Sequence, residues 1–212
     1  MEQQVEKIKN WLGTGSINVF GLPMSGKDTM GMRLADLLGA KFLSSGDIVR
    51  AEERKTNVMI SQEGNLAPQN VFFDLVLPHF EKVELRDYPL VLSSIGRWSG
   101  EENEVISVAK SSGHPIKAAI MLQLSEQTSI ERWEAAKLLN DRGLRPDDAN
   151  PQIFQRRLSE YREKTIPVLR HYQELGLLVP VKANASRDQV LVNAVEALAE
   201  FADNPYNFQT IL

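Results

Sequence analysis

Short apolar runs alternate with segments of helical periodicity along the whole chain of 212 residues. The runs that we predict as strands lie at 17–21, 41–45, 88–95, 116–124 and 177–181. Strands that are apolar throughout and separated by helices are typical of a parallel sheet covered by helices on both faces. The sequence therefore predicts an α/β fold of three layers around a five-stranded parallel sheet.

The same patterning predicts helices at 3–12, 27–39, 46–55, 68–83, 101–113, 125–140, 152–176 and 186–202. Pro167 lies inside the long helix at 152–176 and should bend or interrupt it, because proline has no amide hydrogen to donate. Residues 1–15 precede the first strand, and we expect them to form a helical extension that packs on the core. We see no internal repeat and predict a single domain over 1–212.

The composition excludes several classes of protein. The 24 Lys and Arg and 28 Asp and Glu give a net charge of −4, which provides no global attraction to nucleic acid or to an anionic membrane. The chain has no cysteine, which excludes disulfides, thiolate metal sites and a cysteine nucleophile. The first fifteen residues lack the apolar core of a signal peptide. We expect a cytoplasmic monomer with no nucleic-acid or membrane partner.

The stretch FGLPMSGKDTMG at 20–31 lies between a predicted strand and a predicted helix. Gly21 and Gly26 would let backbone amides approach an anion at the start of the helix, and Lys27 adds a positive charge. The usual phosphate-binding pattern has a hydroxyl directly after the lysine, but here Asp28 comes first and Thr29 second. This context favours a phosphate-binding loop over a plain strand-to-helix turn with a surface lysine.

Four further stretches follow this loop in order: FLSSGDIVR (42–50), EGNLAP (63–68), LVLSSIGR (90–97) and RPDDANPQIFQRRLSEYREKTIPVLRHYQELG (145–176). Together with GLPMSGKDT they resemble the adenylate kinase and nucleoside monophosphate kinase family. The resemblance runs from about residue 17 to about residue 200, and its most specific part is the long helix. It implies a P-loop NTPase fold with a helical acceptor-binding insertion at about 45–80 and a short lid at about 138–149.

The resemblance also implies an activity, which is transfer of the γ-phosphate of ATP, as its Mg²⁺ complex, to a nucleoside monophosphate. AMP is the leading acceptor, and the products would then be two ADP. Alternatives are a UMP/CMP or deoxynucleotide kinase and a P-loop kinase for another small acceptor. A further alternative is a homologue that binds nucleotides with weakened or lost turnover.

Individual site residues are assigned by resemblance to positions of the family motifs. Phosphoryl transfer depends on aligning two anionic ligands and neutralising the moving group, so clustered cations are expected. The expected residues are Met24, Ser25, Gly26, Lys27, Asp28, Thr29, Arg132 and Arg142 for ATP; Lys27, Arg97, Arg132, Arg145 and Arg157 for catalysis; Ser45, Gly46, Arg50, Gly64, Leu66, Arg97 and Glu101 for the acceptor; and Thr29, with Asp47 through water, for Mg²⁺.

We also predict which arginine of the long helix faces the site and how the short lid moves. Arg156 and Arg157 are adjacent and project about 100° apart around a helix, so only one should face the site, and the alignment favours Arg157. The lid is too short for a sheet, and Gly143 would let it close with Arg142 and Arg145 and expel water.

Several positions depart from the family pattern. Ser93 stands where the family has an acid near magnesium; Asp28 either restores that charge or only favours the helix start. Glu101 replaces a glutamine that reads the acceptor base, and its carboxylate can accept from an amino group of adenine or cytosine but cannot donate. Trp98 could stack on a base or pack in the core. Ala136 stands where a donor-side arginine is expected.

Overall fold

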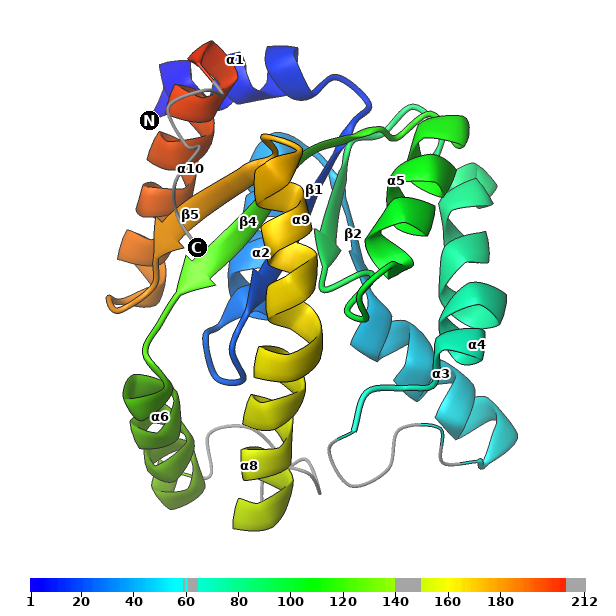
Figure 1. Cartoon of the computed structure of the whole chain (residues 1–212). Helices are drawn as coiled ribbons and strands as arrows, with labels where there is room; N and C mark the ends of the chain where they lie inside the picture. The colour runs from blue at the N-terminus through cyan, green and yellow to red at the C-terminus, as the bar shows by residue number, and fades with distance from the viewer. Residues whose placement is uncertain (59, 61–64, 140–149, 205–212) are drawn as a thin grey trace.

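The protein is built around a five-stranded, all-parallel sheet (Figure 1). The structure, a computed structural model, describes residues 1–58, 60, 65–139 and 150–204. The strands are β1 (Ser16–Gly21), β2 (Lys41–Ser44), β3 (Leu90–Ser93), β4 (Ile116–Gln123) and β5 (Leu178–Lys182), in the spatial order β2-β3-β1-β4-β5. The predicted α/β fold with a five-stranded parallel sheet is confirmed.

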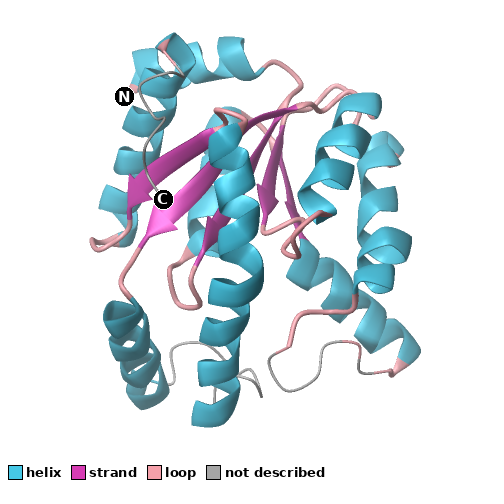
Figure 2. Cartoon of the chain, viewed as in Figure 1, coloured by secondary structure: helices cyan, strands magenta, loops and turns pink. Residues whose placement is uncertain are grey.

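Helices cover both faces of the sheet (Figure 2). The helices α1 (Glu2–Leu12), α2 (Lys27–Leu38) and α10 (Arg187–Asp203) pack on one face, and α5 (Glu101–Ser111), α8 (Pro151–Glu160) and α9 (Ile166–Glu174) pack on the other. Neighbouring strand residues point to opposite faces, so Val19 joins one core and Phe20 the other. Since both faces are covered, most strand residues are buried and apolar, with buried Ser16 and Asn18 as polar exceptions in β1.

Two segments extend from the sheet around the carboxyl ends of its strands. The first contains α3 (Ser45–Thr56), the short helix α4 (Gln69–Val71) and the turns that follow it, and it leads through the 3₁₀ turn η3 (Val83–Leu85) back to β3. The second is α6 (Glu126–Leu139), which lies beside α8 in Figure 1. The first segment covers the range of the insertion predicted at about 45–80, whose role stays a prediction, while most of the predicted lid lies outside the described residues.

The prediction of one regular helix over 68–83 was wrong, and the long helix at 152–176 is interrupted. The first consists of α4, the π-helical turn η1 (Phe72–Val76) and the 3₁₀ turn η2 (Leu77–Glu81). The second consists of α8, the π-helical turn η4 (Tyr161–Thr165) and α9. Each π turn ends two residues before a proline, Pro78 or Pro167. A proline ring clashes with the carbonyl four residues earlier, and the wider turn relieves that clash.

A buried asparagine fixes the chain where it leaves β3. The Asn18 amide nitrogen donates to the Ile95 carbonyl at 2.7 Å, and its oxygen accepts from the Ile95 amide at 3.2 Å. On either side of Ile95 the backbone is left-handed, with φ of 52° at Ser94 and 75° at Gly96. Such a conformation is costly at a non-glycine residue, so its surroundings must enforce it. Asn18 thereby sets the direction of the loop that carries Arg97.

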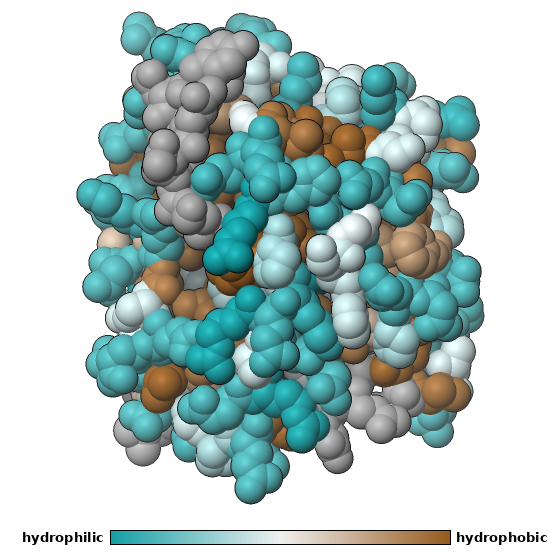
Figure 3. All heavy atoms as spheres, in the orientation of Figure 1, coloured by the Kyte–Doolittle hydropathy of each residue, from teal (hydrophilic) through white to brown (hydrophobic). Residues whose placement is uncertain are grey.

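The surface facing the viewer in Figure 3 is dominated by hydrophilic side chains. In the described part of the chain, no helix combines the length and apolar character needed to cross a membrane.

Replacement of Asn18 by alanine should destabilise the protein by about 2–4 kcal/mol, because it leaves the buried amide and carbonyl of Ile95 without partners. Urea unfolding followed by far-UV circular dichroism measures this loss. The matched control is Asn103→Ala at an exposed position of α5, where we expect a change within about 0.5 kcal/mol. Equal effects at the two positions would contradict a structural role for Asn18.

Candidate active site

The glycine loop after β1 has the geometry of an anion site. A Cβ atom on Gly21 would lie 2.5 Å from the Ser25 side-chain oxygen, so the loop can close only over a glycine at this position. Gly26, with φ of 82°, precedes α2, and no side chain caps the helix there. The first amides of α2 therefore point toward the loop with their positive dipole ends available to an anion.

Two clefts meet at this loop. The first cleft includes Gly21, Pro23 and Lys27 in its wall and extends toward α3 and the loop after β3. The second cleft includes Met24, Ser25, Gly26 and Thr29 and extends toward α6 and α10. Ligands in the two clefts would thus approach each other from opposite sides of the loop. In open α/β sheets, ligands bind at this edge, beyond the carboxyl ends of the strands.

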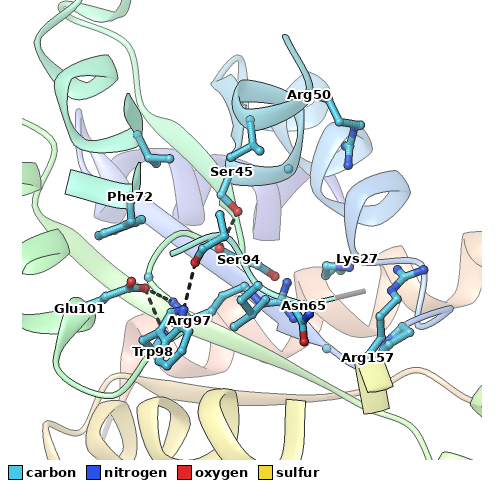
Figure 4. Close-up of a pocket in the computed structure, with 18 residues that line it drawn as sticks. Lys27, Ser45, Arg50, Asn65, Phe72, Ser94, Arg97, Trp98, Glu101 and Arg157 are labelled. Atoms are coloured by element: carbon cyan, nitrogen blue, oxygen red, sulfur yellow. Dashed lines mark hydrogen bonds between the residues drawn. The ribbon is translucent and has the colours of Figure 1, made fainter. Parts of the chain in front are cut away.

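Cationic side chains gather in the first cleft. Lys27, Arg50, Arg97 and Arg157 all line it, and they come from α2, α3, the loop after β3, and α8. In Figure 4, Lys27, Arg50 and Arg157 lie at one end of the cleft, and Phe72 lies at the other end. Burial, together with the positive charge of Arg157, lowers the pKa of Arg97 to about 10. Arg97 remains charged at neutral pH, and an anion in this cleft would relieve the repulsion between the two arginines.

Glu101 lies at the opposite end of the first cleft (Figure 4). The residue is 2% exposed. Its Oε2 accepts from the backbone amides of Arg97 at 2.8 Å and Trp98 at 3.0 Å, while Oε1 has no hydrogen-bond partner among the described residues. Burial raises the pKa of the Glu101 carboxyl, although the two amide bonds oppose that shift. One oxygen thus shapes the loop, and the other is buried beside the cleft without a hydrogen-bond partner among the described residues.

Arg132 links the glycine loop to the segment after β5 at the second cleft. Its guanidinium donates to the carbonyls of Met24 at 3.3 Å and Ala183 at 2.7 Å, and burial lowers its pKa. Ala136 also lines this cleft, so no charged side chain comes from that position. Arg33 and Arg187, which the sequence did not single out, line the same cleft.

The acids near the loop make specific contacts. The Ser93 hydroxyl at the end of β3 donates to Asp28 Oδ1 at 2.5 Å, so two of the positions that depart from the family pattern touch each other. Asp47 accepts from Arg50 at 2.7 Å and lines neither cleft. The Ser45 hydroxyl donates to the Ser94 carbonyl at 2.8 Å and lines the first cleft.

The structure brings most of the predicted site residues to these clefts. Arg157 lines the first cleft, whereas Arg156 lines neither. Gly64, Arg142 and Arg145 lie outside the described residues. The predicted residues that line the first cleft are Lys27, Ser45, Gly46, Arg50, Leu66, Arg97, Glu101 and Arg157, and those that line the second are Met24, Ser25, Gly26, Thr29 and Arg132.

Other residues of the clefts were missed from the sequence. Phe72 and Asn65 line the first cleft, and Arg187 opens α10 at the second. Arg187 carries a usable signal, since it follows a parallel strand closely and the segments after such strands meet at the ligand edge. Phe72 carries none, because an apolar residue in a helix is typical of an ordinary core position.

Comparison with known proteins identifies the family. No protein-family model matches this chain. A protein named adenylate kinase from Agrobacterium fabrum is 31% identical over 192 residues, which cover 86% of this chain and 96% of that protein. The chain belongs to the adenylate kinase family. An adenylate kinase from Methylobacterium nodulans is 29% identical over 191 residues, with 86% of this chain and 94% of that protein covered.

A solved structure supports the fold of this adenylate kinase family member. A gluconokinase from Sinorhizobium meliloti superimposes with a TM-score of 0.57 over 92% of this chain and 97% of its own, at 18% identity. That level of identity supports the fold and says nothing about the acceptor. Membership of the family makes the chain a P-loop phosphotransferase, as the resemblance implied.

Proposed function

We propose that this protein transfers the γ-phosphate of ATP to a nucleoside monophosphate, with AMP as the leading acceptor. The observation that carries the proposal is the group of four cations, Lys27, Arg50, Arg97 and Arg157, in the cleft on one side of the glycine loop. ATP would occupy the second cleft and the monophosphate the first. The short lid at about 138–149, with Arg142 and Arg145, belongs to the same proposal.

The cations would act by position and charge. The loop amides and Lys27 would hold the outer phosphates of ATP, while Arg50 and Arg97 would grip the acceptor phosphate. Arg157, which lies close enough to Arg97 to lower its pKa, would neutralise the group in transfer. The acceptor is already an ionised phosphate, so no side chain needs to remove a proton from it.

Glu101 favours some acceptor bases over others. Its unpartnered Oε1 is buried beside the cleft, and it would accept a hydrogen bond from the amino group of adenine or cytosine once a bound base displaces the side chains that cover it. In the same place, uracil would present a carbonyl oxygen to the carboxylate, and the two acceptors would repel each other. This contact supports AMP first, with CMP next, and disfavours UMP.

Magnesium fits the oxygen donors at the loop. Among the described residues, no three histidine, aspartate or glutamate side chains cluster so as to hold a metal. Mg²⁺ commonly keeps several waters and uses one or two carboxylates together with substrate phosphates. Thr29 and Asp28 would provide oxygens here, and Asp47 would do so through water if it left Arg50. When bound, the ion would offset the negative charge of the phosphates.

A panel of acceptors tests the proposed reaction. Purified protein is mixed with ATP, Mg²⁺ and one of AMP, CMP, UMP, GMP or a deoxy form, and the products are separated by chromatography. We expect AMP to give ADP, and we expect Lys27→Met to lower the rate by about a hundredfold or more, since it removes a charge from the phosphates. Nucleotide binding without product would indicate a homologue without turnover. Use of no monophosphate would indicate another acceptor.

Glu101→Gln should change the choice of base. The amide oxygen can still accept from the two loop amides, so the loop is kept, and the NH₂ group then takes the place of Oε1. There it can donate to a uracil carbonyl but cannot accept from an adenine amino group. We expect the ratio of kcat/KM for AMP over UMP to fall by about tenfold, measured with each acceptor at saturating ATP. An unchanged ratio in a variant with wild-type thermal stability would show that Glu101 does not read the base.

An exchange of acids tests the metal role of Asp28. P-loop enzymes hold Mg²⁺ with a loop hydroxyl and an acid from a nearby strand, and here Asp28 reaches the strand end at Ser93. We expect Asp28→Gly to raise the Mg²⁺ concentration needed for half-maximal rate by about tenfold, and Asp28→Gly with Ser93→Asp to recover it. Electron paramagnetic resonance of Mn²⁺ with bound ATP provides a readout without turnover. An unchanged metal requirement in Asp28→Gly would refute the role.

A further inference from the structure

A closed circuit of contacts joins three separate segments beside the first cleft. Glu160 ends α8, Lys164 lies in the π turn η4, Trp98 lies in the loop after β3, and Leu66 and Ala67 belong to the segment that leads into α4. We call these five residues the clip. Leu66, Ala67 and Trp98 all line the first cleft.

Each contact of the clip is well defined. The Leu66 amide donates to Glu160 Oε2 at 3.2 Å, and the Lys164 ammonium donates to both Glu160 oxygens at 2.7 Å. The same ammonium lies 3.7 Å from the centre of the Trp98 ring. The indole N–H of Trp98 donates to the Ala67 carbonyl at 3.2 Å. Because Leu66 and Ala67 are adjacent in the chain, the contacts form a closed ring.

Burial gives these contacts more weight than surface ion pairs have. The side chains of Glu160 and Lys164 are 10% and 22% exposed, so water and salt screen their attraction weakly. An ammonium over an indole is also held more strongly where water is excluded. Loss of Lys164 would leave the Glu160 carboxylate buried without its ammonium partner and would release one face of Trp98.

The clip connects two segments that line the first cleft. Trp98 is continuous with Arg97, and the backbone amides of both donate to Glu101, so one wall carries groups proposed for the acceptor phosphate and base. Leu66 and Ala67 belong to a second segment that lines the same cleft and contacts Trp98. The negative charge of Glu160 also favours the charged form of Arg97. A change at Lys164 would therefore alter the relative position of these two segments, and with it the width of the cleft, without removing a group that touches the acceptor.

We propose that Lys164 is a positioning residue, which fixes the width of the first cleft by holding Trp98 and Glu160 together. The local structure of the chain supports this arrangement. Lys164 projects from the π turn that precedes Pro167, and it lies one turn beyond Glu160. The effect on kinetics rests on the proposed function, while the effect on the cleft wall does not.

Amide hydrogen exchange tests the clip without reference to activity. In Lys164→Met the Leu66 amide should exchange about tenfold faster than in the wild type, while the Val19 amide in β1 should be unchanged. Lys164→Arg keeps a cation over Trp98 and should retain wild-type protection. A wild-type exchange rate at Leu66 in Lys164→Met would overturn the clip, whatever reaction the protein catalyses.

Kinetics with each substrate tests the positioning role. Lys164→Met should raise KM for AMP about five- to tenfold and leave kcat and KM for ATP within about twofold, and Lys164→Arg should restore KM for AMP. The matched control is Lys41→Met. The Lys41 ammonium lies 4.4 Å from the centre of the Tyr88 ring, at the amino end of β2 and away from the carboxyl ends of the strands. Its loss should change neither KM for AMP nor KM for ATP.

The outcomes separate this inference from the proposed function. If the wild-type protein uses no monophosphate, the proposed function is refuted. The rate of amide hydrogen exchange at Leu66 then still tests whether the contacts of the clip hold this segment in place. Faster exchange at Leu66 with an unchanged KM for AMP overturns the positioning role of Lys164. Equal increases in KM for AMP and ATP overturn it as well, because they indicate a general loss of structure.

Discussion

Parallel pairing places the carboxyl ends of all five strands at one edge of the sheet, and the segments that follow them carry the charged groups of the site. β1 occupies the centre of the sheet, so the glycine loop after it lies between the segments from β3 on one side and from β4 and β5 on the other. This central position lets one loop of backbone amides form part of two clefts. Ligands in the two clefts can then meet across it.

The positive side chains of the first cleft lie close together. The pKa of Arg97 is lowered first by its burial and then by the positive charge of Arg157, which repels it. The Glu160 carboxylate offsets part of this shift, and Lys164 in turn offsets the charge of Glu160. Glu160 thus favours the charged form of Arg97, and Glu160 and Glu101 position the loops through hydrogen bonds.

Two prolines shape the helices that border the first cleft. The π turns before Pro78 and Pro167 include Phe72, which lines the cleft, and Lys164, which supports its wall. A regular α-helix would place these side chains at different angles about the helix axis, since a π turn has more residues per turn. The proline that interrupts each helix therefore contributes to the shape of the site.

The sequence by itself determined the order and type of most elements, the glycine loop and the identity of the cations, because periodicity and turn chemistry act over a few residues. It did not determine the contact of Ser93 with Asp28, 65 residues apart, or that of Leu66 with Glu160, 94 residues apart. It also missed the π turns, since proline predicts an interruption but not its form. Only the packing of helices against the sheet decided which distant side chains meet, because those contacts depend on how all three layers close together.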